Sequence, residues 1–153
     1  MNIREQAEKY NDYIIGQRRY FHRHPELSFE ERETTAAIKR ELEAMGIAVE
    51  TFPDYYGLIG TIEGAEKGPV VMLRADIDAL PSHEKTGLPF ASENDGLMHA
   101  CGHDAHIAML LGAARILCDM KSELRGTVKL LFQSAEESCH GAEYYVEKGC
   151  LDG

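Results

Sequence analysis

Long hydrophobic runs are missing from this sequence of 153 residues. No apolar segment approaches the roughly 20 residues that a membrane-spanning helix needs. The N-terminal stretch MNIREQAEKYNDYIIGQRRY is polar and amphipathic, and it lacks the basic end and apolar core of a signal peptide. We therefore expect a cytoplasmic protein that has no membrane partner.

Positive charge is scarce. There are 16 lysine and arginine residues against 26 aspartate and glutamate residues, so the formal net charge is −10 at pH 7. Neither a phosphate backbone nor an anionic lipid surface attracts such a protein, which argues against a nucleic-acid partner. The acidic balance otherwise indicates only solubility.

Cysteine is sparse as well, and internal repeats and low-complexity tracts are absent. A secreted protein could join four cysteines in two disulfides, but without a signal peptide we expect reduced thiols. A structural zinc finger is not favoured, because Cys139 and His140 form the only Cys/His pair outside the cluster around residue 101. The length corresponds to about one domain.

The N-terminal third predicts two helices. Apolar and aromatic side chains recur near the helical spacing over residues 4–20, which indicates an amphipathic helix. Ser28 lies three residues ahead of Glu31, the pattern of a capping box, so a second helix is expected over residues 30–45. Gly46 is expected to end this second helix.

The pattern then changes to that of an α/β sheet. Apolar runs of strand length, bounded by turn residues, occupy residues 47–52, 57–64, 69–74 and 127–133. The third run is almost continuously apolar and predicts a central buried strand. A helix over residues 104–123 separates it from the fourth run, so we expect a right-handed crossover between strands of an α/β sheet. A short last helix is expected over residues 141–148.

The densest group of reactive side chains is the stretch MHACGHDAH, residues 98–106. It offers a thiol, three imidazoles and a carboxylate, all of which bind metals such as zinc, manganese or nickel once deprotonated. The apolar run of residues 107–117 follows and predicts a buried helix. Cys101 and His103 are therefore expected at or just before a helix N-terminus, where their side chains can converge on a ligand.

Both buried strands are followed by carboxylates. Asp76 and Asp78 follow the third strand, and Glu136 and Glu137 follow the fourth. Ligands of open α/β sheets bind outside the carboxyl ends of the strands. Three separate segments are therefore expected to deliver these carboxylates and the cysteine–histidine cluster to one rim.

A thiolate, an imidazole and a carboxylate can hold one divalent ion with an open position, or share two ions. Water on such an ion can have its pKa lowered toward about 7, which makes hydroxide available to attack a carbonyl. One of the two adjacent glutamates can bind the metal while the other acts as general base toward water and then as general acid toward a departing amine. This chemistry fits amide hydrolysis.

Plainer interpretations exist for each group alone. A glutamate pair most often lies on a solvated surface, the stretch RADID can be a strand end with a helix cap, and His106 can be a core or capping residue. His22 and His24 lie in a connection and are expected to have turn and packing roles. A cysteine nucleophile paired with a histidine is the competing enzymatic hypothesis. The surplus carboxylates oppose it because they favour the protonated thiol, whereas a bound dication reverses that effect.

Four segments together resemble a known family. RRYFHRHPELSFEE, LRADIDALP, MHACGHDAHIAMLLGAARIL and GTVKLLFQSAEE are similar, in order and spacing, to the N-terminal portion of metal-dependent amidohydrolases. That branch includes hippurate hydrolases, N-acyl-amino-acid and N-acetyl-diaminopimelate deacylases and auxin-conjugate hydrolases, within the wider aminoacylase and carboxypeptidase metallopeptidase clan. The resemblance implies the N-terminal part of a three-layer α/β/α zinc-peptidase-like catalytic domain, with a mixed, mostly parallel sheet.

The resemblance also implies roles for individual residues. Cys101 and His103 match metal ligands, and Cys101 would bridge two ions. Glu137 would be a further ligand and Glu136 the catalytic base. Asp78 matches an aspartate that supports a ligand or the catalytic centre.

Three further residues are candidates for contacts that support the ligands. Asp76 falls where other branches of the clan have a histidine ligand, and Asp104 and His106 lie within the CGHDAH motif itself. The complete site would hold two divalent transition-metal ions, and zinc, manganese, nickel or cobalt all suit its ligands. The implied substrate is a small N-acyl amino acid, hydrolysed at its amide bond.

Members of this family are much longer than this chain. They carry an inserted lid and dimerisation domain, and further histidine ligands downstream of the glutamate pair. We therefore expect residues 1–153 to be the N-terminal part of a catalytic domain, inactive alone, within a homodimeric full-length protein. The alternative for this chain is a non-catalytic metal-binding or structural remnant of such an enzyme.

Overall fold

A single four-stranded sheet organises the computed structural model, which describes residues 2–152. The strands lie in the order β1-β2-β4-β3. Their bounds are β1 (Ala48–Thr51), β2 (Gly57–Glu63), β3 (Glu66–Asp76) and β4 (Arg125–Gln133). All four predicted strands are therefore confirmed, with shifts of a few residues at their ends.

The sheet is mixed, as predicted. β3 and β4 pair in parallel, and the connection between them contains the long helix α4 (His103–Asp119), which confirms the predicted strand–helix–strand unit. β1 pairs with β2, and β2 with β4, in antiparallel fashion. Among the described residues only the β3–β4 pair is parallel, so the expectation of a mostly parallel sheet does not hold for this part of the domain.

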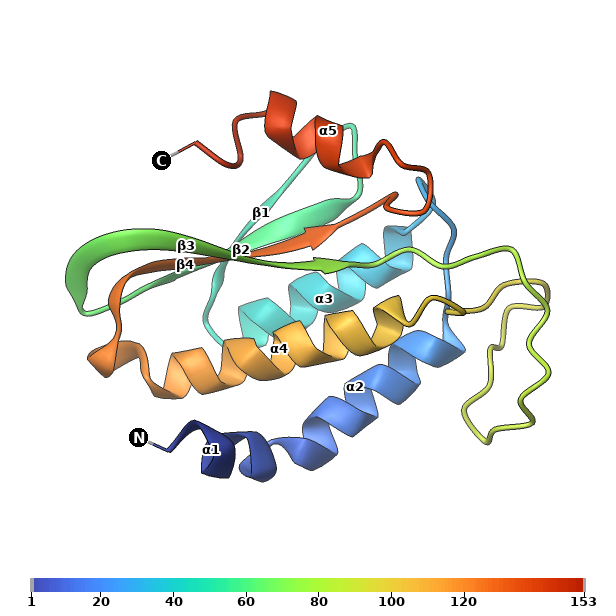
Figure 1. Ribbon diagram of the computed structural model, residues 1–153, viewed down its shortest axis with the longest axis horizontal. Coiled ribbons are helices and arrows are strands. Elements are labelled where there is room, and N and C mark those ends of the chain that lie inside the picture. The colour runs from blue at the N-terminus through green and yellow to red at the C-terminus, as the bar shows by residue number, and fades with distance from the viewer. Residues whose placement is uncertain (1, 153) are drawn as a thin grey trace.

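Helices cover both faces of the sheet, which gives the predicted three layers (Figure 1). On one face lie α4 and α3 (Arg32–Ala44), and α5 (Gly141–Glu147) covers the other face. α2 (Asn11–Arg23), preceded by α1 (Ile3–Lys9), packs against α4, and a short 3₁₀ helix, η1 (Lys121–Glu123), follows α4.

The alternation of side chains along β4 divides the core between the two faces. Leu130 and Phe132 are fully buried in the larger cluster with residues of α3 and α4. Leu131 points the other way and packs with Ile59 and Tyr145 beneath α5. Because both faces of β4 are covered, its sequence is apolar without alternation.

β3 is not the central buried strand that its sequence predicted. It lies at the end of the strand order, and Val70, Val71 and Leu73 are 45%, 50% and 37% exposed. Only its last two residues, Ala75 and Asp76, are buried. A continuous apolar run does not distinguish a central strand from an edge strand, and here β4 takes the central place.

The predicted helix over residues 4–20 is two helices, because the chain turns at Tyr10. Both the Nζ of Lys9 and the Oη of Tyr10 reach the Oδ2 of Asp119, at 2.8 and 2.6 Å. These contacts anchor the turn to the C-terminal end of α4. The spacing of apolar residues in the sequence does not reveal such a long-range contact, so it could not predict the break between the two helices.

The predicted capping box is wrong. Glu31, not Ser28, is the residue that precedes α3, and neither side chain caps this helix. The carboxylate of Glu26 caps it instead, by accepting the backbone N–H groups of Glu33 at 3.1 Å and Thr34 at 2.7 Å. The side chains of Ser28 and Glu31 are therefore available for other contacts.

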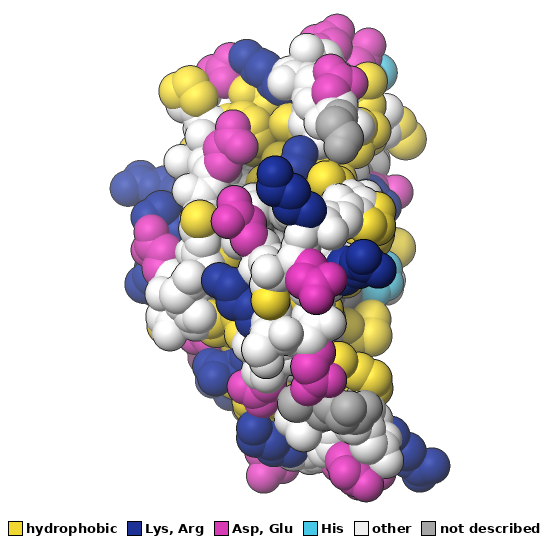
Figure 2. Space-filling model, turned by 90° about the vertical axis from the view of Figure 1, so that its left-hand side faces the viewer, with side chains coloured by type: hydrophobic (Ala, Val, Ile, Leu, Met, Phe, Trp, Pro, Cys, Tyr) yellow, Lys and Arg dark blue, Asp and Glu magenta, His cyan; other side chains and the backbone are white. Residues whose placement is uncertain are grey.

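The surface carries charges of both signs. Figure 2 shows lysine, arginine, aspartate and glutamate side chains interspersed on the left-hand end of the molecule in Figure 1, with no field of one sign on that face. Within residues 2–152, no helix is long and apolar enough to cross a membrane.

We expect the Gly57→Ala substitution to destabilise the protein by about 2–4 kcal/mol. Gly57 begins β2 with a φ of +85°, and an added Cβ would overlap the Oη of Tyr145 and the carbonyl oxygen of Phe132. The control is Gly16→Ala in α2, whose Cβ would meet nothing within 4 Å. Helix propensity predicts a gain of about 0.5–1 kcal/mol for this control. Urea unfolding measures both changes, and equal stabilities of the two variants would contradict the packing described here.

Candidate metal centre

The carboxyl ends of β3 and β4 and the N-terminus of α4 meet at one edge of the sheet, on the right in Figure 1. The parallel pairing places Asp76 opposite Gln133, so the segments that follow the two strands leave the sheet side by side. The structure thus brings together the three segments that the sequence predicted to converge.

Gly102 sets the geometry of the cysteine–histidine pair. It is the residue before α4 and has a φ of +91°, a backbone conformation that residues other than glycine rarely adopt. His103 is the first residue of the helix and is buried, whereas Cys101 lies just outside the helix and is exposed. The sharp turn at Gly102 lets both side chains face the ends of the strands.

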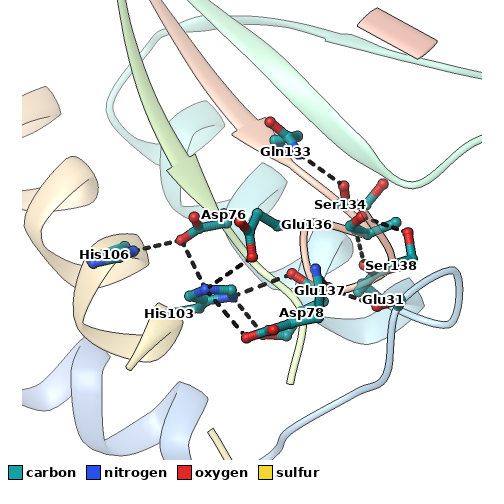
Figure 3. Close-up of polar contacts among 12 residues, drawn as sticks. Glu31, Asp76, Asp78, His103, His106, Gln133, Ser134, Glu136, Glu137 and Ser138 are labelled. Carbon is teal, nitrogen blue, oxygen red and sulfur yellow. Dashed lines mark hydrogen bonds and ion pairs between the residues drawn. The ribbon is translucent and has the colours of Figure 1, made fainter. Parts of the chain in front are cut away.

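Cys101, His103 and Glu137 each place a potential ligand atom within 4.8 Å of the other two. The Nε2 of His103 is 3.7 Å from the Oε1 of Glu137 (Figure 3). This Oε1 is buried and has no hydrogen-bond partner among the described residues. A buried carboxylate oxygen that faces an imidazole nitrogen and a thiol fits a divalent transition-metal ion.

The hydrogen bond between His103 and Asp78 leaves one imidazole nitrogen free. The Nδ1 of His103 donates to the backbone oxygen of Asp78 at 2.9 Å and to its Oδ1 at 3.2 Å. The Nε2 therefore carries the lone pair when the ring is neutral, and it faces the carboxylates. Although burial lowers the pKa of His103, the hydrogen bond to Asp78 and the charge of Asp76 raise it above its ordinary value.

Asp78 connects three segments of the site. Its Oδ2 accepts the hydroxyl of Ser28 at 2.7 Å and the backbone N–H of Glu137 at 2.9 Å. Burial alone would raise the pKa of Asp78, but the hydrogen bonds from His103, Ser28 and Glu137 lower it to about 2. Asp78 is consequently an anion that fixes the orientation of His103.

The thiol of Cys101 lies among carboxylates. The adjacent Glu137 carboxylate, slight desolvation and the charges of Glu136 and Asp76 all raise the pKa of Cys101. The thiolate that a cysteine nucleophile needs is therefore disfavoured in this environment. A bound dication would reverse the effect by stabilising the thiolate.

Asp76, His103 and His106 form a second group of potential ligands within 4.8 Å. The Nδ1 of His106 lies 2.5 Å from the Oδ1 of Asp76, and the two imidazole rings stack with centroids 5.5 Å apart. Both groups depend on the single free nitrogen of His103, which can bind one ion only. Asp76 and His106 therefore flank the group that contains Cys101.

Asp104 faces away from these ligand atoms. It is completely buried, and its Oδ2 lies 2.6 Å from the Nδ1 of His22 and 2.9 Å from the Nε of Arg18. These contacts tie α4 to α2. His22 lies within α2, not in a connection as the sequence indicated, and it has the predicted packing role.

The two adjacent glutamates differ in exposure more than in direction. The carboxylates of Glu136 and Glu137 both lie 3.7 Å from the Nε2 of His103 (Figure 3). The side chain of Glu136 is 39% exposed and that of Glu137 is 22% exposed. Glu136 is thus the more accessible to a molecule entering from solvent.

Sequence reasoning missed Ser28 and Glu31 as parts of this site. The Oε1 of Glu31 accepts the backbone N–H of Ala135 at 2.7 Å, one residue before Glu136. In the sequence the spacing of the two residues matches a capping box, which accounts for both of them, and no other local pattern indicates a role in the site. Only the approach of the chain after β4 to the turn before α3 gives them this role.

The comparisons with known proteins agree on one class. The model of peptidase family M20/M25/M40 matches residues 72–153, more than half of the chain. The chain is 53% identical over 140 residues to N-acetyl-L-cysteine deacetylase of Bacillus subtilis, covering 92% of this chain and 34% of that protein. It is 47% identical over 145 residues to IAA-amino acid hydrolase ILR1-like 5 of Arabidopsis thaliana, covering 95% and 33%.

Solved structures give the same result. The crystal structure of the Bacillus subtilis YXEP protein, described as a dinuclear metal binding peptidase from the M20 family, superposes with a TM-score of 0.92 at 50% identity. This match covers 95% of this chain and 41% of that one. A putative aminohydrolase from methicillin-resistant Staphylococcus aureus gives a TM-score of 0.93 at 45% identity, covering 97% and 40%.

The fold is the α/β fold of these M20 structures. The chain belongs to peptidase family M20/M25/M40, which confirms the resemblance found in the sequence. It spans about a third of the length of the curated relatives that it matches.

The pH dependence of stability is expected to report on Glu31. Burial, and then the charges of Asp78 and Glu26, raise the pKa of Glu31 to about 7, although the Ala135 N–H opposes this shift. The folded protein therefore holds this proton more tightly than the unfolded chain does, and the stabilisation present at low pH is lost as the pH rises through about 7.

The Glu31→Gln substitution should remove the loss of stability that the wild type shows as the pH rises through about 7. Between pH 4.5 and 7.5, we expect the free energy of unfolding of the wild type to fall by about 2–3 kcal/mol relative to the variant. Glu30→Gln, in the exposed position next to it, is the control and should follow the wild type. Denaturant titrations across this pH range measure the difference, and parallel curves for Glu31→Gln and wild type would contradict the raised pKa.

Proposed function

We propose that the full-length protein hydrolyses the amide bond of N-acyl amino acids in a metal-dependent reaction, and that this chain supplies the N-terminal part of its catalytic domain. The observation that carries the proposal is the convergence of Cys101, His103 and Glu137 within 4.8 Å, beside the partly exposed carboxylate of Glu136. The names of the relatives support the substrate class. They include N-acyl-L-amino acid amidohydrolase of Geobacillus stearothermophilus, at 41% identity over 152 residues.

Cys101, His103 and Glu137 would hold part of a centre of two divalent ions. Histidines further along the full-length chain would complete it. Zinc, manganese, nickel and cobalt all suit thiolate, imidazole and carboxylate ligands, and their availability decides among them. When bound, such ions supply Lewis acidity that lowers the pKa of water and polarises the amide carbonyl.

Glu136 moves the proton. Its carboxylate takes a proton from the attacking water as the water oxygen bonds to the acyl carbon. The carbon–nitrogen bond then breaks, and Glu136 returns the proton to the departing amine nitrogen. Asp78 keeps the proton of His103 on Nδ1, so that Nε2 stays available as a ligand.

A second candidate applies to the 153 residues alone. Three ligand side chains leave a shell that downstream residues would have to complete, which favours a metal-binding but inactive piece. We expect the isolated chain to show little or no hydrolysis of N-acyl amino acids. The full-length protein is proposed to act as a homodimer, through a lid domain outside this chain.

The Glu136→Gln substitution in the full-length protein is expected to lower kcat for an N-acetyl amino acid by about 10²-fold or more, because it removes the general base. The metal content should not change, since Glu136 is not proposed as a ligand. The matched control is Glu147→Gln, an exposed carboxylate on α5, which should keep full activity. Steady-state kinetics and metal analysis by mass spectrometry provide the two measurements.

Activity of Glu136→Gln within a few-fold of the wild type would refute its role as the base. A chelator separates the metal mechanism from the cysteine-nucleophile alternative with the same assay. Wild-type turnover that survives the chelator and is abolished by a thiol alkylator would favour the nucleophile.

A further inference from the structure

Glu31 is a completely buried carboxylate for which amide hydrolysis provides no role. It precedes α3, yet its side chain makes no capping hydrogen bond to that helix. The side chain instead crosses to the segment after β4, where its Oε1 accepts the N–H of Ala135 at 2.7 Å. A buried carboxyl group that does not cap the adjacent helix and instead accepts one distant backbone N–H needs an explanation, because burying a carboxyl group is costly.

Ala135 has an uncommon backbone conformation. Its φ is +55°, in the left-handed region that residues other than glycine seldom occupy. Its carbonyl oxygen accepts the hydroxyl of Ser138 at 2.7 Å and the N–H of Gly141 at 3.1 Å, while Glu31 holds its N–H. Both peptide groups of Ala135 are therefore fixed, and such strain persists only where surrounding contacts enforce it.

We propose that Glu31 is a positioning residue: by holding the N–H of Ala135, it fixes the left-handed turn that directs Glu136 and Glu137 toward His103. The inference rests on the proposed function, in which Glu136 is the general base and Glu137 a metal ligand. Ala135 immediately precedes the glutamate pair, so its backbone angles set where both carboxylates point. Figure 3 shows Glu31 on the opposite side of this turn from His103.

The turn before α3 holds the site at a second point. The hydroxyl of Ser28 donates to the Oδ2 of Asp78 at 2.7 Å, and the same oxygen accepts the N–H of Glu137 at 2.9 Å. Phe29, between Ser28 and Glu31, also has a positive φ, of 67°. The turn thus contacts the site through two side chains, Glu31 at the N–H of Ala135 and Ser28 at the carboxylate of Asp78.

The chemistry of the contact selects the test variants. The Oε2 of Glu31 is buried without a partner among the described residues, so the role needs one accepting oxygen and no charge. Glutamine keeps that oxygen at the same reach. Leucine fills similar space without an acceptor, and aspartate keeps the acid but is one methylene shorter. Glu30→Gln is the matched control, an exposed carboxylate in the same turn.

Kinetics of the full-length protein with an N-acetyl amino acid are the first readout. We expect Glu31→Leu and Glu31→Asp to lower kcat about 10- to 100-fold, as removal of contacts that orient metal ligands typically does, with KM nearly unchanged. Glu31→Gln and Glu30→Gln should stay close to the wild type. A merely structural role would not give this split between kcat and KM or this recovery by glutamine.

Cobalt(II) affinity, measured by titration of the metal-free protein, is the second readout and needs no turnover. It should weaken about 10-fold or more in Glu31→Leu and Glu31→Asp, because Glu137 loses its direction, and not in Glu31→Gln. If the wild type lacked hydrolysis, the proposed function would fail while this titration still tested Glu31. If Glu31→Leu failed to fold, the kinetics and cobalt affinity of Glu31→Asp would test the inference instead. Wild-type kcat and cobalt affinity in the aspartate variant, or a glutamine variant as impaired as leucine, would overturn the inference.

Discussion

The hydrogen bond from His103 to Asp78 is the interaction on which the rest of the site depends. It fixes the imidazole so that Nε2 faces the carboxylates, and it occupies one oxygen of a buried anion. The other oxygen of Asp78 binds Ser28 and the backbone of Glu137. Through this one carboxylate, the turn before α3, the end of β3, the start of α4 and the segment after β4 take fixed positions. A structural change in any of these segments is therefore expected to shift the positions of the ligand atoms.

The site concentrates negative charge around a single imidazole nitrogen. Asp76, Glu136 and Glu137 each bring a carboxylate oxygen within 3.7 Å of the Nε2 of His103. Carboxylates that gather around one nitrogen repel one another, and a buried carboxylate oxygen without a partner is unfavourable. A divalent cation relieves both costs, which explains why a folded protein would retain this arrangement. The stability of the domain and its affinity for metal are thus expected to be coupled.

The sequence predicted those features that local patterns determine. The apolar run of β4, the crossover through α4 and the convergence of Cys101, His103 and the glutamates follow from periodicity and from the rule for strand ends. The order of the strands does not follow, because an apolar run such as β3 can occupy an edge or a centre. Glu31 was hidden for a related reason. Its spacing from Ser28 satisfies a capping pattern, and only a contact between residues 104 positions apart gives it a different role.

Direct ligation of a transition metal by Cys101 is the central claim, and the absorption spectrum of the cobalt(II)-loaded protein tests it most directly. A thiolate ligand gives a near-ultraviolet charge-transfer band that imidazole and carboxylate ligands do not give. We predict this band in the wild type and in Cys139→Ser, in which an exposed cysteine of the same region is removed. The band should be lost in Cys101→Ser. A band of unchanged intensity in Cys101→Ser would contradict the account, since the metal would then be bound by another thiol.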